Sequence, residues 1–195
     1  DGTSETTGIK TVNPNIEEVF YVDLNATGLN NGTSWANAYN SLQDALARAS
    51  SGDQVWVAAG EYLPTSGTDR EASFRVASGV SIYGSLPSGA SALTAQDTAA
   101  YPTILSGNIG DPATNTDNVY NVVTFGPVSD FTLLKGLHIT GGYADRSDNF
   151  FFGNGAGVFN SNFATDSTSG VVLQDLMLYG NTAVLNGVIY LKIRR

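Results

Sequence analysis

TLLKGLHITGGYA, at Thr132–Ala144, returns further along the chain as VVLQDLMLYGNTA, at Val171–Ala183. Aligning Leu134 with Leu173 keeps the apolar residues of the two copies in step and brings a glycine of each copy to the same place. Within each copy apolar residues alternate with polar ones, a period of two that is typical of strands with one buried face. The stretch therefore predicts short strands that are repeated in register.

Shorter copies extend the pattern. Val158-Phe159 matches Ile189-Tyr190, and Val76–Gly84 (VASGVSIYG) matches the longer copies when Ile82 is aligned with Ile139. The spacing between copies varies while the apolar pattern is kept, which indicates loops of variable length between fixed strands. Since no long helical stripe separates the strands, the sequence predicts an all-β parallel β-helix, a solenoid in which each strand pairs with its copy one coil away.

A single helix is expected before the first repeat, at Ser41–Ala49 (SLQDALARA). Its apolar residues follow helical spacing. The helix would cover the apolar N-terminal end of the solenoid, where core and strand edges are otherwise exposed. Long loops rich in Gly, Ser, Thr, Asn and Asp are expected to leave the coils at Pro64–Arg70, Ser85–Tyr101 and Ser106–Asn118.

The domain boundary is expected near residue 18. Asp1–Glu18 is polar and lacks a consistent period, which predicts a tail or linker. Residues 19–195 are long enough for a single domain with a sizeable core. The chain starts at Asp1 rather than Met, and this start favours a mature, exported protein.

Composition favours an extracellular or bacterial cell-surface β-protein. Only 14% of the residues are charged, Gly numbers 22 and Cys is absent, which is the balance of a turn-rich protein without disulfides or thiolate metal sites. The formal net charge of −9 disfavours nucleic acid and anionic membranes as partners, because both need a basic surface. No apolar run approaches the roughly 18 residues of a membrane span, so no membrane insertion is expected.

One loop carries candidate metal ligands. DLNATGLNNG contains Asp23, Asn25, Asn30 and Asn31, whose side-chain oxygens are of the kind that Ca²⁺ prefers. The loop has a single carboxylate and lacks the spacing of a known calcium loop, so an ordinary turn is the favoured interpretation. Calcium at this loop is the one cofactor that the sequence suggests.

A second loop is unusual because three aromatic residues, Phe150, Phe151 and Phe152, lie in a polar insertion. One interpretation is an adhesive patch for a glycan or a neighbouring protein. The other, which we favour, is that the phenylalanines fold back over the strands and cover them locally.

The C-terminal end is expected to lack a cap. Val188 and Tyr190 belong to another strand copy, and Lys192, Arg194 and Arg195 follow it directly. Since repeat proteins need a polar terminal cap for solubility, either a further part of the same polypeptide or a second molecule would cover this end. The basic rim would suit an acidic partner end, such as the N-terminal side of another copy, in end-to-end filaments.

The sequence offers little for catalysis. The best cluster of charged residues combines Lys135 with Asp145, Arg146 and Asp148, and ordinary solvated charges explain it more simply. His138 is the one histidine in the chain, which is too few for an imidazole metal site or a convincing triad. We therefore predict no catalytic residues.

Three passages, besides the strand copies described above, resemble bacterial right-handed parallel β-helix repeat proteins of the pectate-lyase-like superfamily. They are YVDLNATGLNNGTSWANAYNSLQDAL at Tyr21–Leu46, QVWVAAGEY at Gln54–Tyr62 and PTILSGNIG at Pro102–Gly110. The resemblance covers nearly the whole chain and implies the fold far more specifically than an activity. It implies a stalk, an adhesin or a carbohydrate-facing scaffold, and some relatives are polysaccharide lyases.

Together these patterns predict a non-enzymatic secreted or cell-surface module with a structural or adhesive role, which self-assembles end to end. The alternative is a polysaccharide-binding or polysaccharide-lyase-type protein that acts on acidic glycans, with a Lys or Arg as the base.

Overall fold

The computed structural model describes residues 17–160 and 170–191. Strands make up 34% of the described residues and helices are few among them, so the strand-dominated composition predicted from the alternating pattern is present. The strands are β1 (Val19–Val22), β2 (Gln54–Ala58), β3 (Gly60–Tyr62), β4 (Phe74–Val76), β5 (Ser81–Leu86), β6 (Thr103–Ser106), β7 (Val123–Phe125), β8 (Phe131–Lys135), β9 (His138–Thr140), β10 (Tyr143–Ala144), β11 (Val158–Asn160), β12 (Gly170–Gln174), β13 (Met177–Tyr179), β14 (Thr182–Ala183) and β15 (Ile189–Leu191). The helices are α1 (Leu42–Arg48) and a 3₁₀ turn, η1 (Leu93–Ala95).

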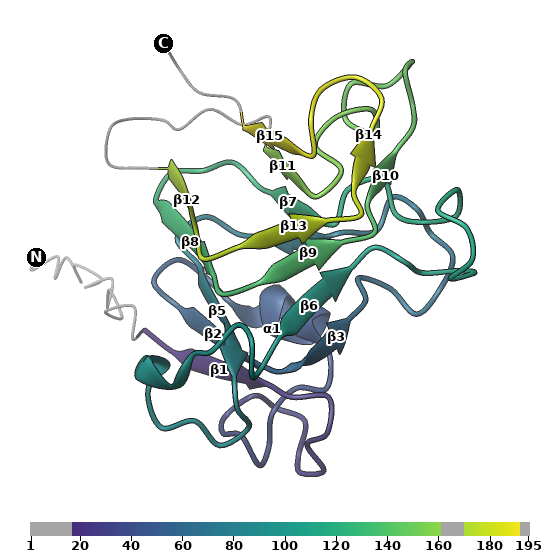
Figure 1. Cartoon of the computed structure of the whole chain (residues 1–195). Helices are drawn as coiled ribbons and strands as arrows, with labels where there is room; N and C mark the ends of the chain where they lie inside the picture. The colour runs from purple at the N-terminus through teal and green to yellow at the C-terminus, as the bar shows by residue number, and fades with distance from the viewer. Residues whose placement is uncertain (1–16, 161–169, 192–195) are drawn as a thin grey trace, which may run out of the picture.

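The strands form four parallel sheets (Figure 1). The largest has the order β1-β2-β5-β8-β12, two others have the orders β13-β9-β6-β3 and β15-β11-β7-β4, and a small one pairs β10 with β14. Strands that are adjacent in a sheet are distant in sequence, because the chain visits other sheets between them or, between β1 and β2, forms a long loop and α1. Every pairing between these strands is parallel.

The prediction of a single right-handed parallel β-helix is wrong, because the strands are divided among several separate parallel sheets rather than forming one solenoid. The physical reason is that the alternation of apolar and polar residues carries limited information. A period of two tells which face of a strand is buried, but it does not tell which sheet the strand joins.

Several predicted pairings are nevertheless present within the sheets. Leu134 lies opposite Leu173, and Phe159 lies opposite Tyr190. The predicted alignment of Val76–Gly84 is wrong, since Ile82 pairs with Leu134 and not with Ile139.

The error in that alignment has a structural cause. Gly79 and Gly136 both have positive φ and both precede a strand, so their local sequences look alike. Gly79 leads into β5 of the five-stranded sheet, whereas Gly136 leads into β9 of another sheet. Gly84 lies inside β5, where an added Cβ would stand 2.6 Å from the Gly136 carbonyl oxygen. Its role is close packing.

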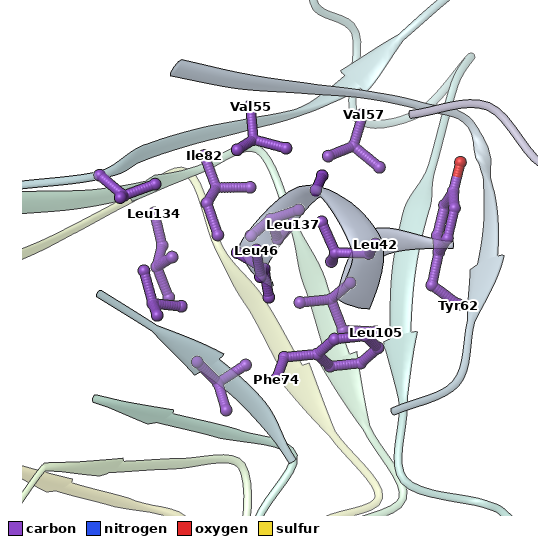
Figure 2. Close-up of a cluster of buried hydrophobic side chains, with 14 of the residues drawn as sticks. Leu42, Leu46, Val55, Val57, Tyr62, Phe74, Ile82, Leu105, Leu134 and Leu137 are labelled. Atoms are coloured by element: carbon purple, nitrogen blue, oxygen red, sulfur yellow. The ribbon is translucent and has the colours of Figure 1, made fainter. Parts of the chain in front are cut away.

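The core lies between the sheets. Phe20, Val55, Ile82 and Leu134 occupy successive positions across the five-stranded sheet, and all four are buried. Figure 2 shows side chains from different elements, including Val55, Ile82 and Leu134, gathered in the same interior as Leu42 and Leu46. Full burial of one such side chain stabilises the fold by about 1.5–3 kcal/mol.

The helix is where the sequence predicts it. Ser41 is its N-cap, and the Ser41 hydroxyl accepts a hydrogen bond from the Gln43 N–H at 3.1 Å. Leu42, Ala45 and Leu46 are buried, and the helix packs against β1, β2 and β4. This apolar stripe places α1 over one end of the sheets.

Candidate functional site

The end of the molecule around β1 is closed by the chain itself. The outer edge of β1 is hydrogen-bonded to the segment 32–39: the Tyr21 N–H donates to the Gly32 carbonyl, and the Tyr39 N–H donates to the Tyr21 carbonyl, both at 2.9 Å. The Asp23 N–H donates to the Tyr39 carbonyl, also at 2.9 Å. Helix α1 covers the core beside this edge. We call β1, α1 and segment 23–40 the closed end.

The opposite end of the molecule carries the last strand of each sheet, and we call β12, β13, β14 and β15 together the open edge (Figure 1). Among the described strands, each of these four pairs on one side only. Such an edge presents unpaired backbone N–H and C=O groups. Large apolar side chains are exposed along it and in the turn before β15: Val172, Met177, Tyr179, Val184, Leu185, Val188 and Ile189.

An aromatic cluster lies beside β15. It consists of Phe150, Phe151, Phe159 and Tyr190, with Phe159 and Tyr190 stacked at 5.5 Å between ring centroids. The edge of Phe150 meets both of these rings, at 6.0 and 5.3 Å. Phe151 meets Phe159 at 5.6 Å and remains 53% exposed. The cluster is thus packed on the strands on one side and open to solvent on the other.

Phe152 differs from its two neighbours. Its ring stacks on Tyr120 at 4.6 Å, and the Arg70 guanidinium lies 4.1 Å from the centroid of the Tyr120 ring. Arg70 also forms an ion pair with Asp145 at 3.1 Å. Of the three phenylalanines, Phe152 therefore fits the interpretation of a local cover, while Phe150 and Phe151 combine packing with exposure.

The residues predicted for assembly are only partly described. Tyr190 lies on β15 of the open edge and belongs to the aromatic cluster, and Val188 directly precedes β15. Lys192, Arg194 and Arg195 lie outside the described residues, as do residues 1–16 of the expected tail.

The candidate calcium loop is fastened by its own polar side chains. Asp23 Oδ1 accepts the Asn25 N–H at 2.9 Å, Asn30 Oδ1 accepts the Asn40 N–H at 2.8 Å, and Asn31 Oδ1 accepts the Thr33 N–H at 3.2 Å. These contacts are the ones that Asp and Asn make in tight turns. They support the turn interpretation, and calcium binding at Asp23, Asn25, Asn30 and Asn31 stays a prediction.

The charged cluster predicted around Lys135 does not share one set of contacts. Lys135 lies 3.9 Å from Asp175, Arg146 binds Asp148 at 2.9 Å, and Asp145 binds Arg70. The Arg146 hydrogen bond lowers the pKa of Asp148 and raises that of Arg146, an effect of the exposed pair itself. His138 packs edge-on against Tyr179 at 6.2 Å.

Tyr62 and Asp97 also have perturbed pKa values, both for structural reasons. Burial, followed by the negative charge of Asp23, raises the pKa of the Tyr62 hydroxyl, which donates a hydrogen bond to the Ala58 carbonyl at 3.1 Å. Backbone N–H groups of Ala100 and Ala99 lower the pKa of the exposed Asp97. Both groups have local explanations that involve no catalytic partner.

Sequence reasoning missed part of the open edge, namely Val184, Leu185 and the outward residues Val172 and Met177. Their exposure follows from the position of β12, β13 and β14 as last strands, which the residue pattern does not reveal.

Comparison of this chain with protein-family models, curated proteins and solved structures found no match. The likeness to the pectate-lyase-like superfamily thus stays a resemblance between sequence motifs. No helix in the described part of the chain is both long and apolar enough to cross a bilayer. Within the same residues, no three His, Asp or Glu side chains converge in a way that would hold a metal ion.

Proposed function

We propose that this protein is a non-enzymatic structural or adhesive module, outside the cell or at the bacterial surface, that associates with a partner through its open edge. The observation that carries the proposal is the contrast between the two ends. At the closed end, segment 32–39 forms hydrogen bonds with the backbone of the edge strand β1. At the open edge, by contrast, the last strands pair on one side only among the described strands, and large apolar side chains are exposed. Addition of strands to such an edge is a general mode of protein association.

A second copy of the chain is the partner that we propose. Two copies that meet through their open edges present the same exposed residues to each other, which is the arrangement of a two-fold dimer. Head-to-tail filaments through strand pairing are less favoured, because segment 32–39 would have to leave the edge of β1 first. Since each chain has a formal net charge of −9, added salt should strengthen the dimer by screening repulsion.

The distribution of charge supports a role without catalysis. The basic residues near the candidate cluster have separate acidic neighbours: Asp175 for Lys135, Asp148 for Arg146 and Asp145 for Arg70. A general base works best when its pKa is matched to the reaction and when it reaches the substrate. These separate pairs do not form such an arrangement.

A second candidate function is binding or cleavage of an acidic polysaccharide. One observation favours it: Lys135 lines a polar cleft of about 440 Å³ together with Gln96, Asp97 and Thr98. A screen of uronic-acid polymers with Ca²⁺, followed by the absorbance of unsaturated products, tests the lyase. If the wild type shows lyase activity and Lys135→Ala loses it, the structural proposal is wrong and the enzymatic function takes its place.

Sedimentation velocity over a range of concentrations tests the dimer. Met177→Lys places a charge on the outward face of β13, where Met177 is 57% exposed, and should shift the protein to the monomer. Leu29→Lys is the matched control, since Leu29 is 75% exposed in the loop at the closed end. It should leave the dimer unchanged. A wild-type chain that stays monomeric at high concentration and high salt would refute the proposed partner.

A further inference from the structure

The loop between β6 and β7 has a feature unrelated to the open edge. Its base is closed by a hydrogen bond from the Val119 N–H to the Gly107 carbonyl at 3.0 Å. Further out, the Asp111 N–H donates to Asp117 Oδ2 at 2.7 Å. The Asp117 carboxylate lies against Gly110, where an added Cβ would collide with it. Asn108, Asp117 and Asn118 are thereby held between these two closures.

Three side-chain oxygens of this loop have no hydrogen-bond donor among the described residues. They are Asn108 Oδ1, Asp117 Oδ1 and Asn118 Oδ1, and all three are closed to water. Asn118 as a whole is only 5% exposed. An unpaired buried carbonyl or carboxylate oxygen costs about 1–3 kcal/mol, and more when it carries charge. Each of these atoms therefore calls for a partner, and the closure between Gly107 and Val119 places their residues next to one another at the base of the loop.

The chemistry of the three oxygen atoms limits which groups can be their partner. All are acceptors, so the missing group is a hydrogen-bond donor or a cation, and the carboxylate charge of Asp117 favours a cation. A calcium ion holds oxygen ligands at about 2.3–2.6 Å, whereas a water oxygen approaches another oxygen only to about 2.7–2.8 Å. A bare cation thus approaches these oxygens more closely than a water molecule does. Carboxylate and amide oxygens together are ligands that Ca²⁺ takes in proteins.

The surroundings favour a cation. Asn108 and Asn118 line a polar cleft of about 560 Å³ that also contains Glu61 and the hydroxyls of Ser106, Thr114 and Thr140. Among the described residues, no Lys, Arg or His lines this cleft. It provides a route for the ion and space for the waters that complete its coordination.

One basic group lies nearby and is already paired. Arg70 Nε donates to the Asn118 backbone carbonyl at 2.6 Å. Its guanidinium forms an ion pair with Asp145 at 3.1 Å and stacks over Tyr120. The side-chain oxygen of Asn118 is left for another ligand.

We infer that Asn108, Asp117 and Asn118 form a calcium site in the 107–119 loop. Asp117 supplies the charge, and the two amide oxygens supply neutral ligands. With a single carboxylate the affinity falls in the weak range of extracellular calcium modules, a dissociation constant of about 10⁻⁴–10⁻³ M. This site is separate from the loop at Asp23, where Asp23, Asn30 and Asn31 each accept a backbone N–H.

Equilibrium dialysis of the full chain against Ca²⁺ alone, up to about ten times the upper value of that range, tests the inference. We expect one ion per chain and weaker binding of Mg²⁺, which demands a tighter octahedral site. Asp117→Asn should weaken calcium binding by at least about tenfold. A rise in the temperature of unfolding with Ca²⁺ in the wild type, reduced in this variant, provides an independent measurement.

Two control variants separate this site from general charge effects. Asp111→Asn removes the same charge from the same loop, and its Oδ1 only accepts the Ala113 N–H, so binding should change less than about twofold. Asp23→Asn should also leave binding unchanged. The inference is overturned if the wild type binds no Ca²⁺, if Asp111→Asn and Asp117→Asn weaken binding equally, or if Asp23→Asn alone abolishes it.

Discussion

The closed end and the open edge are built from the same kind of strand, yet they finish the sheets in opposite ways. At the closed end β1 is hydrogen-bonded on its outer side by segment 32–39, and α1 buries Leu42, Ala45 and Leu46 against the core. At the open edge the inward residues are only half-buried, and Met177 and Tyr179 are exposed. The difference arises because a helix and a long loop lie over β1, whereas none of the described helices lies over β12 or β13.

This contrast indicates how stability is distributed. Side chains at the closed end contact core on several sides, while those at the open edge lose contacts on the side where no described strand is added. The same substitution should therefore have a large effect at one end and a small effect at the other.

The largest difference is expected for leucine truncation. Leu42 of α1 is 1% exposed, and Leu42→Ala should destabilise the fold by about 2–5 kcal/mol through lost burial and the remaining cavity. Leu178 is only partly buried on β13, so Leu178→Ala should cost clearly less. Urea unfolding followed by far-ultraviolet circular dichroism measures both values. Equal losses would show that the open edge is covered in solution.

An intermediate effect is expected for Asp53, which fastens the chain at the closed end. Its Oδ1 accepts the Glu18 N–H at 2.9 Å, and its Oδ2 accepts the Ser50 N–H at 2.8 Å. Burial opposes ionisation of this carboxyl, but the hydrogen bonds from Glu18 and Ser50 outweigh it and lower its pKa. Asp53→Asn leaves one of these donors facing an amide N–H₂ and should cost about 1–3 kcal/mol near neutral pH.

The pH dependence of that loss checks its origin. Because the pKa of Asp53 is lower in the folded state, its contribution is fully present above the ordinary value of 3.8 and is lost as the pH falls through the folded-state pKa. The difference in unfolding free energy between wild type and Asp53→Asn should therefore be constant above about pH 5 and shrink below about pH 4. If the difference in unfolding free energy stays the same below about pH 4, the loss in Asp53→Asn comes from altered packing and not from the missing charge.

The sequence predicts the strands and the helix well because both depend on local periodicity. The pairing of Leu134 with Leu173 follows from residue alternation and a repeated glycine, and that of Phe159 with Tyr190 follows from the matching apolar pair alone. The single solenoid does not follow, because the number of sheets is decided by how the chain turns between strands. Gly79 and Gly136 show this, since similar local sequences lead into different sheets.

The candidate sites were less accessible to sequence reasoning. The aromatic insertion at Phe150 is visible as a run of apolar residues in a polar loop, although its packing on Phe159 and Tyr190 depends on contacts between distant segments. Asn108 and Asn118 look like ordinary loop residues. Only the fold shows that the Asn118 side chain is buried and that its oxygen has no donor among the described residues. The closure of β1 by segment 32–39 is likewise a tertiary contact.

The smallest effect is expected at the open edge, and it tests the proposed partner. Val172 on β12 is 42% exposed, so Val172→Thr keeps a β-branched residue and should change the unfolding free energy of the monomer by less than about 0.5 kcal/mol. If two copies meet through this edge, the same change removes apolar area from the interface, and its cost should grow with protein concentration because association stabilises the folded state. Thermal unfolding at low and high protein concentration separates the two contributions. A cost that stays small at every concentration would leave β12 outside the interface and confine the contact to β13 and β15.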